Sequence, residues 1–159
     1  MSERYLINVN GEQREVEAEP WHSLLDVLRE KLRLTGSKIG CNEAECGSCT
    51  VLLGGLPILA CITLVGDVRD KEVLTIEGIS QKEGPHPIQT RMVELGGIQC
   101  GYCTPGIIMS AYALLEVSPD PDEEEIRQAI SGNICRCTGY SKIVDAVRVA
   151  AKDLREISQ

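Results

Sequence analysis

Eight cysteines in a chain of 159 residues are the feature that most constrains what this sequence can fold into. Four lie in the first half and four in the second. The first residues carry no secretory signal, and the apolar runs are too short to span a bilayer. We therefore expect a cytoplasmic protein with no membrane contact, whose thiols stay reduced and bind metal rather than form disulfides.

The two histidines, His22 and His86, lie away from both cysteine groups, so sulfur ligands alone are expected at any metal site. The formal net charge is -8, which repels phosphate backbones and argues against nucleic acid as a partner. Aromatic residues make up only 3% of the chain, which disfavours base-stacking platforms.

The first cysteine set has the pattern C-x4-C-x2-C followed by a distant fourth cysteine; its members are Cys41, Cys46, Cys49 and Cys61. This is the spacing of plant-type ferredoxins, in which one loop wraps three ligands around a [2Fe–2S] cluster and another segment supplies the fourth. Gly40 and Gly47 suit a tight loop. The spacing therefore predicts a first [2Fe–2S] cluster on these four thiolates.

The second cysteine set combines C-x2-C with C-x-C; its members are Cys100, Cys103, Cys135 and Cys137. Each pair comes just before a predicted helix, and helix N-termini stabilise thiolates. Two such helices could hold a second cluster between them. A zinc site of paired knuckles is an alternative that fits this set better than the first. A redox dithiol at Cys100 and Cys103 would need a βαβ pattern that is lacking.

The apolar periodicity changes from strands to helices along the chain. The first half predicts strands at 5–9, 13–17, 50–53, 56–60 and 72–76, with one helix over 24–32. The second half predicts helices over 88–95, from Pro105 with Thr104 as its N-cap, from Asp120-Pro121 and from near Tyr140. We expect an α+β chain with a first domain at 1–78, a linker at 79–87 and a helical domain at 88–159.

Three segments resemble the motifs of a known family: Gly40 to Val51, Gln99 to Gly106 and Gly132 to Tyr140. Together they resemble the iron–sulfur small subunits of molybdenum hydroxylases, the xanthine oxidase family. The resemblance covers essentially the whole chain. It implies a β-grasp, plant-type ferredoxin-like domain followed by a four-helix bundle, each holding one [2Fe–2S] cluster.

The resemblance also implies partners. A large subunit carries molybdenum on molybdopterin, in the cytosine dinucleotide form, and a medium subunit carries FAD. The three would form a heterotrimer that dimerises to (αβγ)2. By resemblance, Gln99 and Cys137 lie nearest the pterin. Electrons would pass from molybdenum through the second cysteine set, then the first, to FAD, so this chain would hold no catalytic residue.

Three other functions stay open at this stage. One is a zinc-stabilised adaptor without redox activity. A second is a complex of the 4-hydroxybenzoyl-CoA reductase type, in which electrons run in the reductive direction. A third is an independent ferredoxin, which the second domain disfavours. The substrate, whether carbon monoxide, an aldehyde, a purine, an N-heterocycle or an aromatic acyl-CoA, would be selected in the large subunit.

Overall fold

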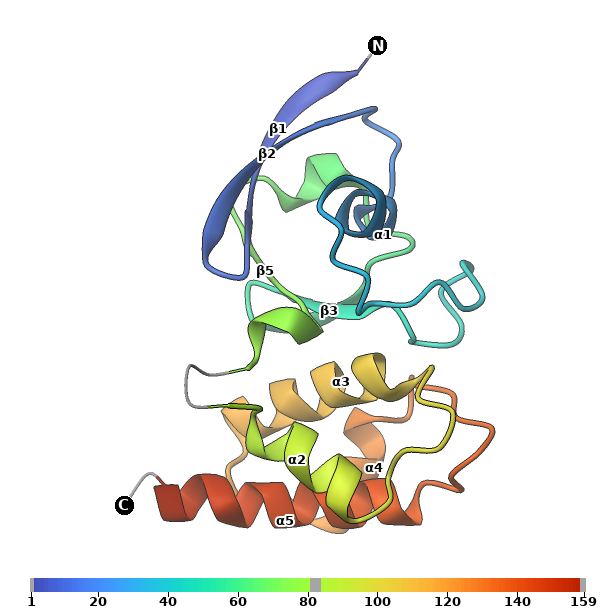
Figure 1. The fold of residues 1–159 in the computed structure, drawn as a ribbon, viewed down its shortest axis with the longest axis vertical. Helices are drawn as coiled ribbons and strands as arrows, with labels where there is room; N and C mark the ends of the chain where they lie inside the picture. The colour runs from blue at the N-terminus through green and yellow to red at the C-terminus, as the bar shows by residue number, and fades with distance from the viewer. Residues whose placement is uncertain (1, 81–83, 158–159) are drawn as a thin grey trace.

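The computed structural model describes residues 2–80 and 84–157. Figure 1 shows a strand-rich part at the top, which contains the N-terminus, and a bundle of helices beneath it. Helix α3 (Thr104–Val117) is the element of the bundle that lies nearest to the strands. Leu52 from the strand-rich part is buried in the same apolar cluster as Ile107 and Met109 of α3, so the two parts pack directly together.

The strand-rich part begins with a hairpin of β1 (Glu3–Val9) and β2 (Glu12–Ala18). Its turn uses Asn10 and Gly11, both with positive φ, as expected for a two-residue hairpin loop. Alternate side chains of β1 point into the core, because successive residues of a strand face opposite sides.

Three further strands complete the sheet: β3 (Thr50–Leu53), β4 (Leu56–Leu59) and β5 (Glu72–Leu74). The order across the sheet is β2-β1-β5-β3-β4, and β5 runs parallel to β1 but antiparallel to β3. The 3-10 turns η2 (Val65–Val68) and η3 (Ile76–Gly78) flank β5. The predicted strand 72–76 is therefore too long, because Thr75 leaves the ladder and its N–H donates to Asn10 Oδ1 at 2.9 Å.

One helical segment packs into the core of this part of the molecule. It consists of α1 (Leu24–Asp26) and a wider π-type turn, η1 (Val27–Lys31). Leu24, Leu25 and Leu28 are completely buried beside the sheet residues. The predicted helix 24–32 thus occurs, but its last turn widens, with the Leu32 N–H donating to the Val27 carbonyl.

The bundle consists of α2 (Pro87–Glu94), α3, α4 (Glu123–Ala129) and α5 (Ser141–Ile157). Apolar faces from all four helices form one core. Arg91 of α2 and Asp153 of α5 form a bidentate ion pair, with N–O distances of 2.6 and 3.0 Å. The predicted α+β fold, a ferredoxin-like domain followed by a four-helix bundle, is confirmed.

Two predicted helix starts are wrong by one or two residues. Thr104 is the first residue of α3 and not its cap, which is Cys103. Helix α4 is capped by Asp122 rather than by Asp120. The Asp122 carboxylate accepts the Glu125 N–H at 2.8 Å, and the Glu125 carboxylate accepts the Asp122 N–H at 2.8 Å, which is a reciprocal capping box. Asp120 instead forms an ion pair with Arg155 of α5.

The predicted linker at 79–87 can be compared with the structure at its C-terminal end only. Helix α2 starts at Pro87, the last position of the predicted linker, and His86 caps it. Residues 81–83 of that linker lie outside the described residues, and the domain boundaries at 78 and 88 stay a prediction. No helix in the described part of the chain is long and apolar enough to cross a membrane.

Candidate metal centres

The first cysteine loop directs backbone N–H groups at sulfur. Cys41 Sγ accepts from the N–H groups of Glu43 at 3.3 Å, Glu45 at 3.3 Å and Cys46 at 3.4 Å. The Cys41 N–H in turn donates to Cys46 Sγ at 3.3 Å. The backbone donors of Glu43, Cys46 and Glu45 lower the pKa of Cys41 to about 7. This loop therefore stabilises thiolate before any metal is considered.

The shape of the loop explains how so many N–H groups converge. Asn42, Ala44 and Gly47 all have positive φ, between 59° and 69°. Left-handed residues among right-handed ones turn successive N–H groups toward one side, which creates a concave anion site. Gly40 lies against this concavity, where an added Cβ would be 2.5 Å from Cys46 Sγ. The loop thus has no room for a side chain at position 40.

The other two thiols of the first set come from the sheet. Cys49 lies just before β3 and is buried, and Cys61 follows β4. Burial raises the pKa of Cys49 to about 12. A backbone N–H at Cys61 lowers it, while the Cys61 and Cys46 thiols are close enough to raise it further. The fold therefore brings this set together from one loop and two strand ends, the start of β3 and the end of β4.

The second cysteine set lies at the ends of three helices. Cys103 caps α3, and the segment with Cys135 and Cys137 connects α4 to α5. Cys137 Sγ donates to Cys100 Sγ at 3.7 Å. Burial raises the pKa of Cys103 to about 12, with Cys135 and Cys100 nearby adding to the effect. The four thiols of this set are thus neighbours, and their role as ligands of one cluster stays a prediction.

The second set is buried on one side only. Cys103 and Cys135 pack against the apolar core of the bundle, whereas Cys100 and Cys137 are exposed. Burial raises the pKa of Cys135, but hydrogen bonds from Thr138 and from the backbone outweigh it, and the net pKa is lowered. The exposed edge leaves one side of the site open to a partner group.

Gln99 directly precedes this exposed edge. It is itself exposed, one residue before Cys100. An exposed side-chain amide can donate hydrogen bonds to a polar cofactor of another subunit and accept hydrogen bonds from it. Its predicted place beside molybdopterin stays a prediction.

The donor chemistry fits two [2Fe–2S] clusters. All eight cysteines are free thiols, arranged as two sets of four, and thiolate sulfur is the ligand type that such clusters use. Glycine and positive-φ residues shape the first loop around the sulfurs. Within residues 2–80 and 84–157, no three Cys, His, Asp or Glu side chains stand close enough to hold a single metal ion.

Two residues between the cysteine sets were not predicted from the sequence. Asn133 donates from Nδ2 to the Gly47 carbonyl at 2.9 Å, and the Ile134 N–H donates to the Cys46 carbonyl at 2.9 Å. The segment of the second set therefore bonds to the loop of the first. Their position in the sequence could have pointed to them, because Asn133 and Ile134 come just before Cys135 in one of the three motifs that resemble the family.

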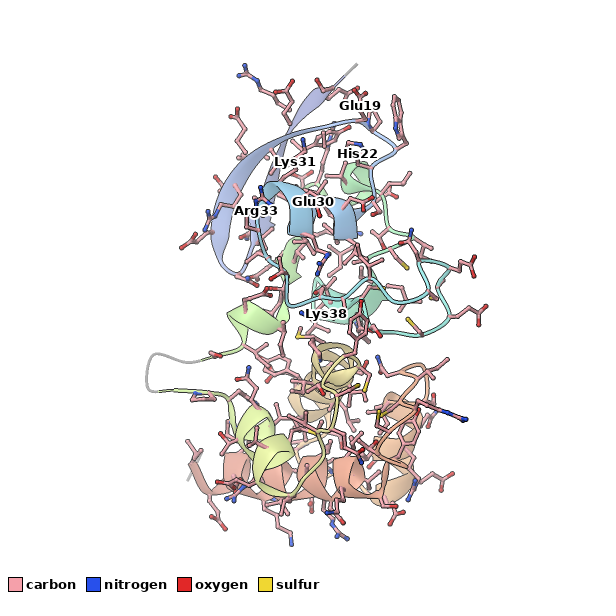
Figure 2. The ribbon with its side chains drawn as sticks, turned by 45° about the vertical axis from the view of Figure 1, so that its right-hand side comes forward. Glu19, His22, Glu30, Lys31, Arg33 and Lys38 are labelled. Atoms are coloured by element: carbon pink, nitrogen blue, oxygen red, sulfur yellow. The ribbon has the colours of Figure 1, made fainter. Side chains whose placement is uncertain are left out.

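Several basic side chains lie along residues 29–38, the segment that leads into the first loop. Arg29 Nη1 donates to the carbonyls of Thr35 at 2.9 Å and Ser37 at 2.7 Å, and Lys38 Nζ also reaches the Thr35 carbonyl, at 2.8 Å. Figure 2 labels Lys31, Arg33 and Lys38 along this segment, with Lys38 close to the level at which the two parts of the molecule meet. These contacts fix the chain as it enters the cysteine loop.

Comparison with protein families assigns both halves of the chain to iron–sulfur domains. Residues 7–72 match the 2Fe-2S iron-sulfur cluster binding domain, and residues 75–148 match the [2Fe-2S] binding domain. These matches favour iron–sulfur clusters over the zinc alternative.

Individual proteins extend the similarity over nearly the whole chain. The nicotinate dehydrogenase small FeS subunit of Eubacterium barkeri is 49% identical over 92% of this chain and 93% of its own length. Aldehyde oxidoreductase of Megalodesulfovibrio gigas is 45% identical over 92% of this chain, which corresponds to 16% of that protein. The solved structure of quinoline 2-oxidoreductase from Pseudomonas putida 86 matches with a TM-score of 0.93 and 39% identity, covering 98% of this chain and 97% of that one.

Proposed function

The chain belongs to the iron–sulfur small subunits of the molybdenum hydroxylases, and we propose that it carries electrons between molybdopterin in a large subunit and FAD in a medium subunit. The observation that carries the proposal is the direct link between the two cysteine sets. Ile134, next to Cys135, donates its N–H to the carbonyl of Cys46 at 2.9 Å. Two electron-carrying sites connected so closely suit a relay.

The cysteines are the proposed ligands. Cys41, Cys46, Cys49 and Cys61 would hold one [2Fe–2S] cluster, and Cys100, Cys103, Cys135 and Cys137 the other. When bound, such a cluster supplies a one-electron carrier whose potential depends on hydrogen bonds to sulfur and on solvent exposure. The protein's own contribution is to hold deprotonated sulfurs, as the N–H donors around Cys41 already do.

The uneven exposure of the second set supports an order for the relay. Cys100, Cys137 and Gln99 are exposed at one edge, which suits close approach by a cofactor of the large subunit. The first set lies in the ferredoxin-like part and is proposed to face FAD. The residues of this chain bind and orient, and the chemistry on the substrate takes place in the large subunit.

The proposed assembly is a heterotrimer with large and medium subunits, dimerised to (αβγ)2. The molybdopterin is proposed to be the cytosine dinucleotide form. Relatives named for nicotinate, xanthine and aldehyde indicate that one small-subunit fold serves several substrates. The substrate is therefore proposed to be set by the large subunit.

The test compares Cys46→Ala with Cys137→Ala in the assembled complex. Each change removes one of four ligands and should cost only its own cluster. With Cys46→Ala, substrate should still reduce the second site while the flavin stays oxidised on the turnover timescale. With Cys137→Ala, electrons should not leave molybdenum. Rapid mixing with substrate followed by freeze-quench EPR separates these outcomes.

Metal and FAD contents are measured first, because cluster loss can also weaken assembly. The unmodified complex should contain about four iron atoms per small subunit, as two two-iron clusters require. Zinc in place of iron would contradict the proposal. The order of the relay would be reversed if Cys46→Ala blocked reduction of the second site and Cys137→Ala still passed electrons to FAD.

A further inference from the structure

Two consecutive residues of one segment meet two consecutive carbonyls of the other. After α4, Asn133 reaches the carbonyl of Gly47 through its side chain, and Ile134 reaches the carbonyl of Cys46 through its backbone, both at 2.9 Å. Gly47 lies between two proposed ligands of the first set, and Ile134 directly precedes a ligand of the second. These two hydrogen bonds connect the two cysteine motifs directly, and we call the contact of Asn133 and Ile134 with Cys46 and Gly47 the joint.

The Asn133 side chain is held firmly at this joint. The residue is only 2% exposed, and besides the Gly47 carbonyl its Nδ2 reaches Thr50 Oγ1 at 3.2 Å. Thr50 Oγ1 itself donates to the Gly47 carbonyl at 2.7 Å. A buried amide with both acceptors in place is fixed in orientation, since losing either bond would leave a polar group without a partner away from water.

The backbone of Asn133 connects to the second cysteine set. Its carbonyl accepts the Tyr140 hydroxyl at 3.0 Å, and the same hydroxyl accepts the Cys135 N–H at 2.7 Å. Asn133 therefore bonds to the turn that contains Cys46 and Cys49, and through Tyr140 to the backbone of Cys135. A single residue thus connects both motifs.

The backbones at the joint are packed too closely to admit an added side chain. A Cβ at Gly47 would collide with the Gly132 carbonyl oxygen, and a Cβ at Gly106 of α3 would collide with the Gly47 carbonyl oxygen. The two backbones thus approach each other closely at glycines, which have no Cβ. Any side chain added there would force the first loop away from the bundle.

We propose that Asn133 is a positioning residue that fixes the separation between the two cysteine sets. The proposal rests on the proposed function, because the separation matters only if each set holds a redox cluster. Magnetic interaction between two paramagnetic centres, and electron transfer between them, both weaken steeply as their separation grows. Asn133 would therefore set how strongly the two sites communicate, without touching any sulfur.

The experiment uses the assembled complex with two variants that act on the joint in different ways. Asn133→Ala removes the side-chain bond to the Gly47 carbonyl. Gly106→Ala keeps Asn133 but inserts a methyl group against that carbonyl, while alanine suits the helix. After full reduction with dithionite, low-temperature EPR measures the splitting that each site imposes on the other. Both variants should retain full iron and lose the resolved splitting.

Thr75→Val is the matched control. Thr75 is also fully buried, and its side chain hydrogen-bonds to Asn10 and Glu77 within the strand-rich part alone. This variant should lower thermal stability but leave the splitting unchanged. The proposal is overturned if the joint variants keep the splitting, or if Thr75→Val loses it equally.

The positioning role and the proposed function can fail separately. Two distinct iron–sulfur signals without mutual splitting in the unmodified complex would overturn the positioning role and leave the proposed function intact. Zinc, or a single paramagnetic species, would overturn the proposed function itself. If Asn133→Ala does not assemble, Gly106→Ala decides the question, since it removes no hydrogen-bonding group.

Discussion

At the scale of single residues, the thiols differ in how readily they lose their protons. Backbone donors lower the pKa of Cys41 to about 7, whereas burial raises the pKa values of Cys49 and Cys103 to about 12. A metal ion replaces the proton of each thiol it binds, so the raised values make metal binding more dependent on pH at those two positions. This pH dependence is much weaker for Cys41 near neutral pH, because its pKa is already about 7.

The first prediction concerns the glycine beside the first cysteine loop. In Gly40→Ala, the new Cβ would lie 2.5 Å from Cys46 Sγ and 3.3 Å from Ser48 Oγ, so the loop must open. We expect this variant to retain about two iron atoms per chain instead of about four, because only the first site is disturbed. Iron analysis with EPR of the reduced protein measures this directly.

Gly66→Ala is the control for that prediction. An added Cβ at Gly66 would meet only the Tyr5 ring, at 4.0 Å, which is an ordinary contact. This variant should keep its full iron content. Full iron and both EPR signals in Gly40→Ala would show that the loop tolerates a side chain, contrary to the prediction.

Single residues also mark how far the sequence could predict the site. The cysteine sets follow from spacing, because ligand geometry demands that spacing whatever the rest of the chain does. The role of Asn133 cannot be predicted from sequence spacing. Its partners, Gly47 and Thr50, lie more than eighty positions away, and only the packing of α3 against β3 brings them within reach.

At the scale of elements, helix ends carry interactions that apolar periodicity does not reveal. Periodicity predicted the strands and helices, since alternation and a helical repeat each leave a clear pattern. It could not choose between Asp120 and Asp122 as the cap of α4, because both are good capping residues and both have an acidic residue three positions later. The choice depends on the reciprocal bonds between Asp122 and Glu125.

The second prediction tests this choice of cap. Asp122→Ala should lower the free energy of unfolding by about 1 kcal/mol, since it removes an N-cap side chain. Asp120→Ala removes only an exposed ion pair with Arg155 and should cost clearly less. Chemical denaturation followed by far-UV circular dichroism compares the two variants. An equal or larger loss for Asp120→Ala would contradict the assigned cap.

The third prediction concerns the cap of α2. His86 Nδ1 accepts the Ile88 N–H at 3.3 Å, which requires the neutral ring, and burial lowers the pKa of His86 below its usual 6.5. The unfolded chain therefore takes up this proton more readily than the folded one. The stabilisation is fully present above about pH 6.5 and is lost as the pH falls through the lowered pKa.

His86→Ser provides the measurement for that prediction. A serine hydroxyl can still accept the Ile88 N–H, but it does not titrate. Melting temperatures recorded between about pH 5 and pH 8 should therefore fall less steeply at the acidic end in this variant than in the unmodified protein. Parallel curves would mean that His86 does not contribute to the acid sensitivity.

At the scale of the whole molecule, charge and exposure favour assembly with other subunits. The chain carries a formal charge of -8, to which two oxidised clusters with four thiolates each would add about -4. Cys100 and Cys137 stand exposed at one edge. A site that is open to water on one side is protected when a partner surface covers it.

The fourth prediction follows from this exposure. The natural protein should elute from gel filtration within a larger complex that contains molybdenum. The isolated small subunit should lose iron in air faster than the complex does. The cluster of the second cysteine set should be lost first, because Cys100 and Cys137 are exposed. The measurement is iron content and EPR over time. A stable species of 17.4 kDa with both clusters intact would contradict it.

The order of the two cysteine sets along the chain has a consequence for biosynthesis. The first set is complete once Cys61 has left the ribosome, whereas the second needs Cys137, after α3 and α4. The contact between Asn133 and Gly47 is completed later still, because it also involves Tyr140, which follows Cys137 and whose hydroxyl donates to the Asn133 carbonyl. Iron delivered during translation would therefore enter the N-terminal site first, and closure of the joint would complete maturation of the subunit.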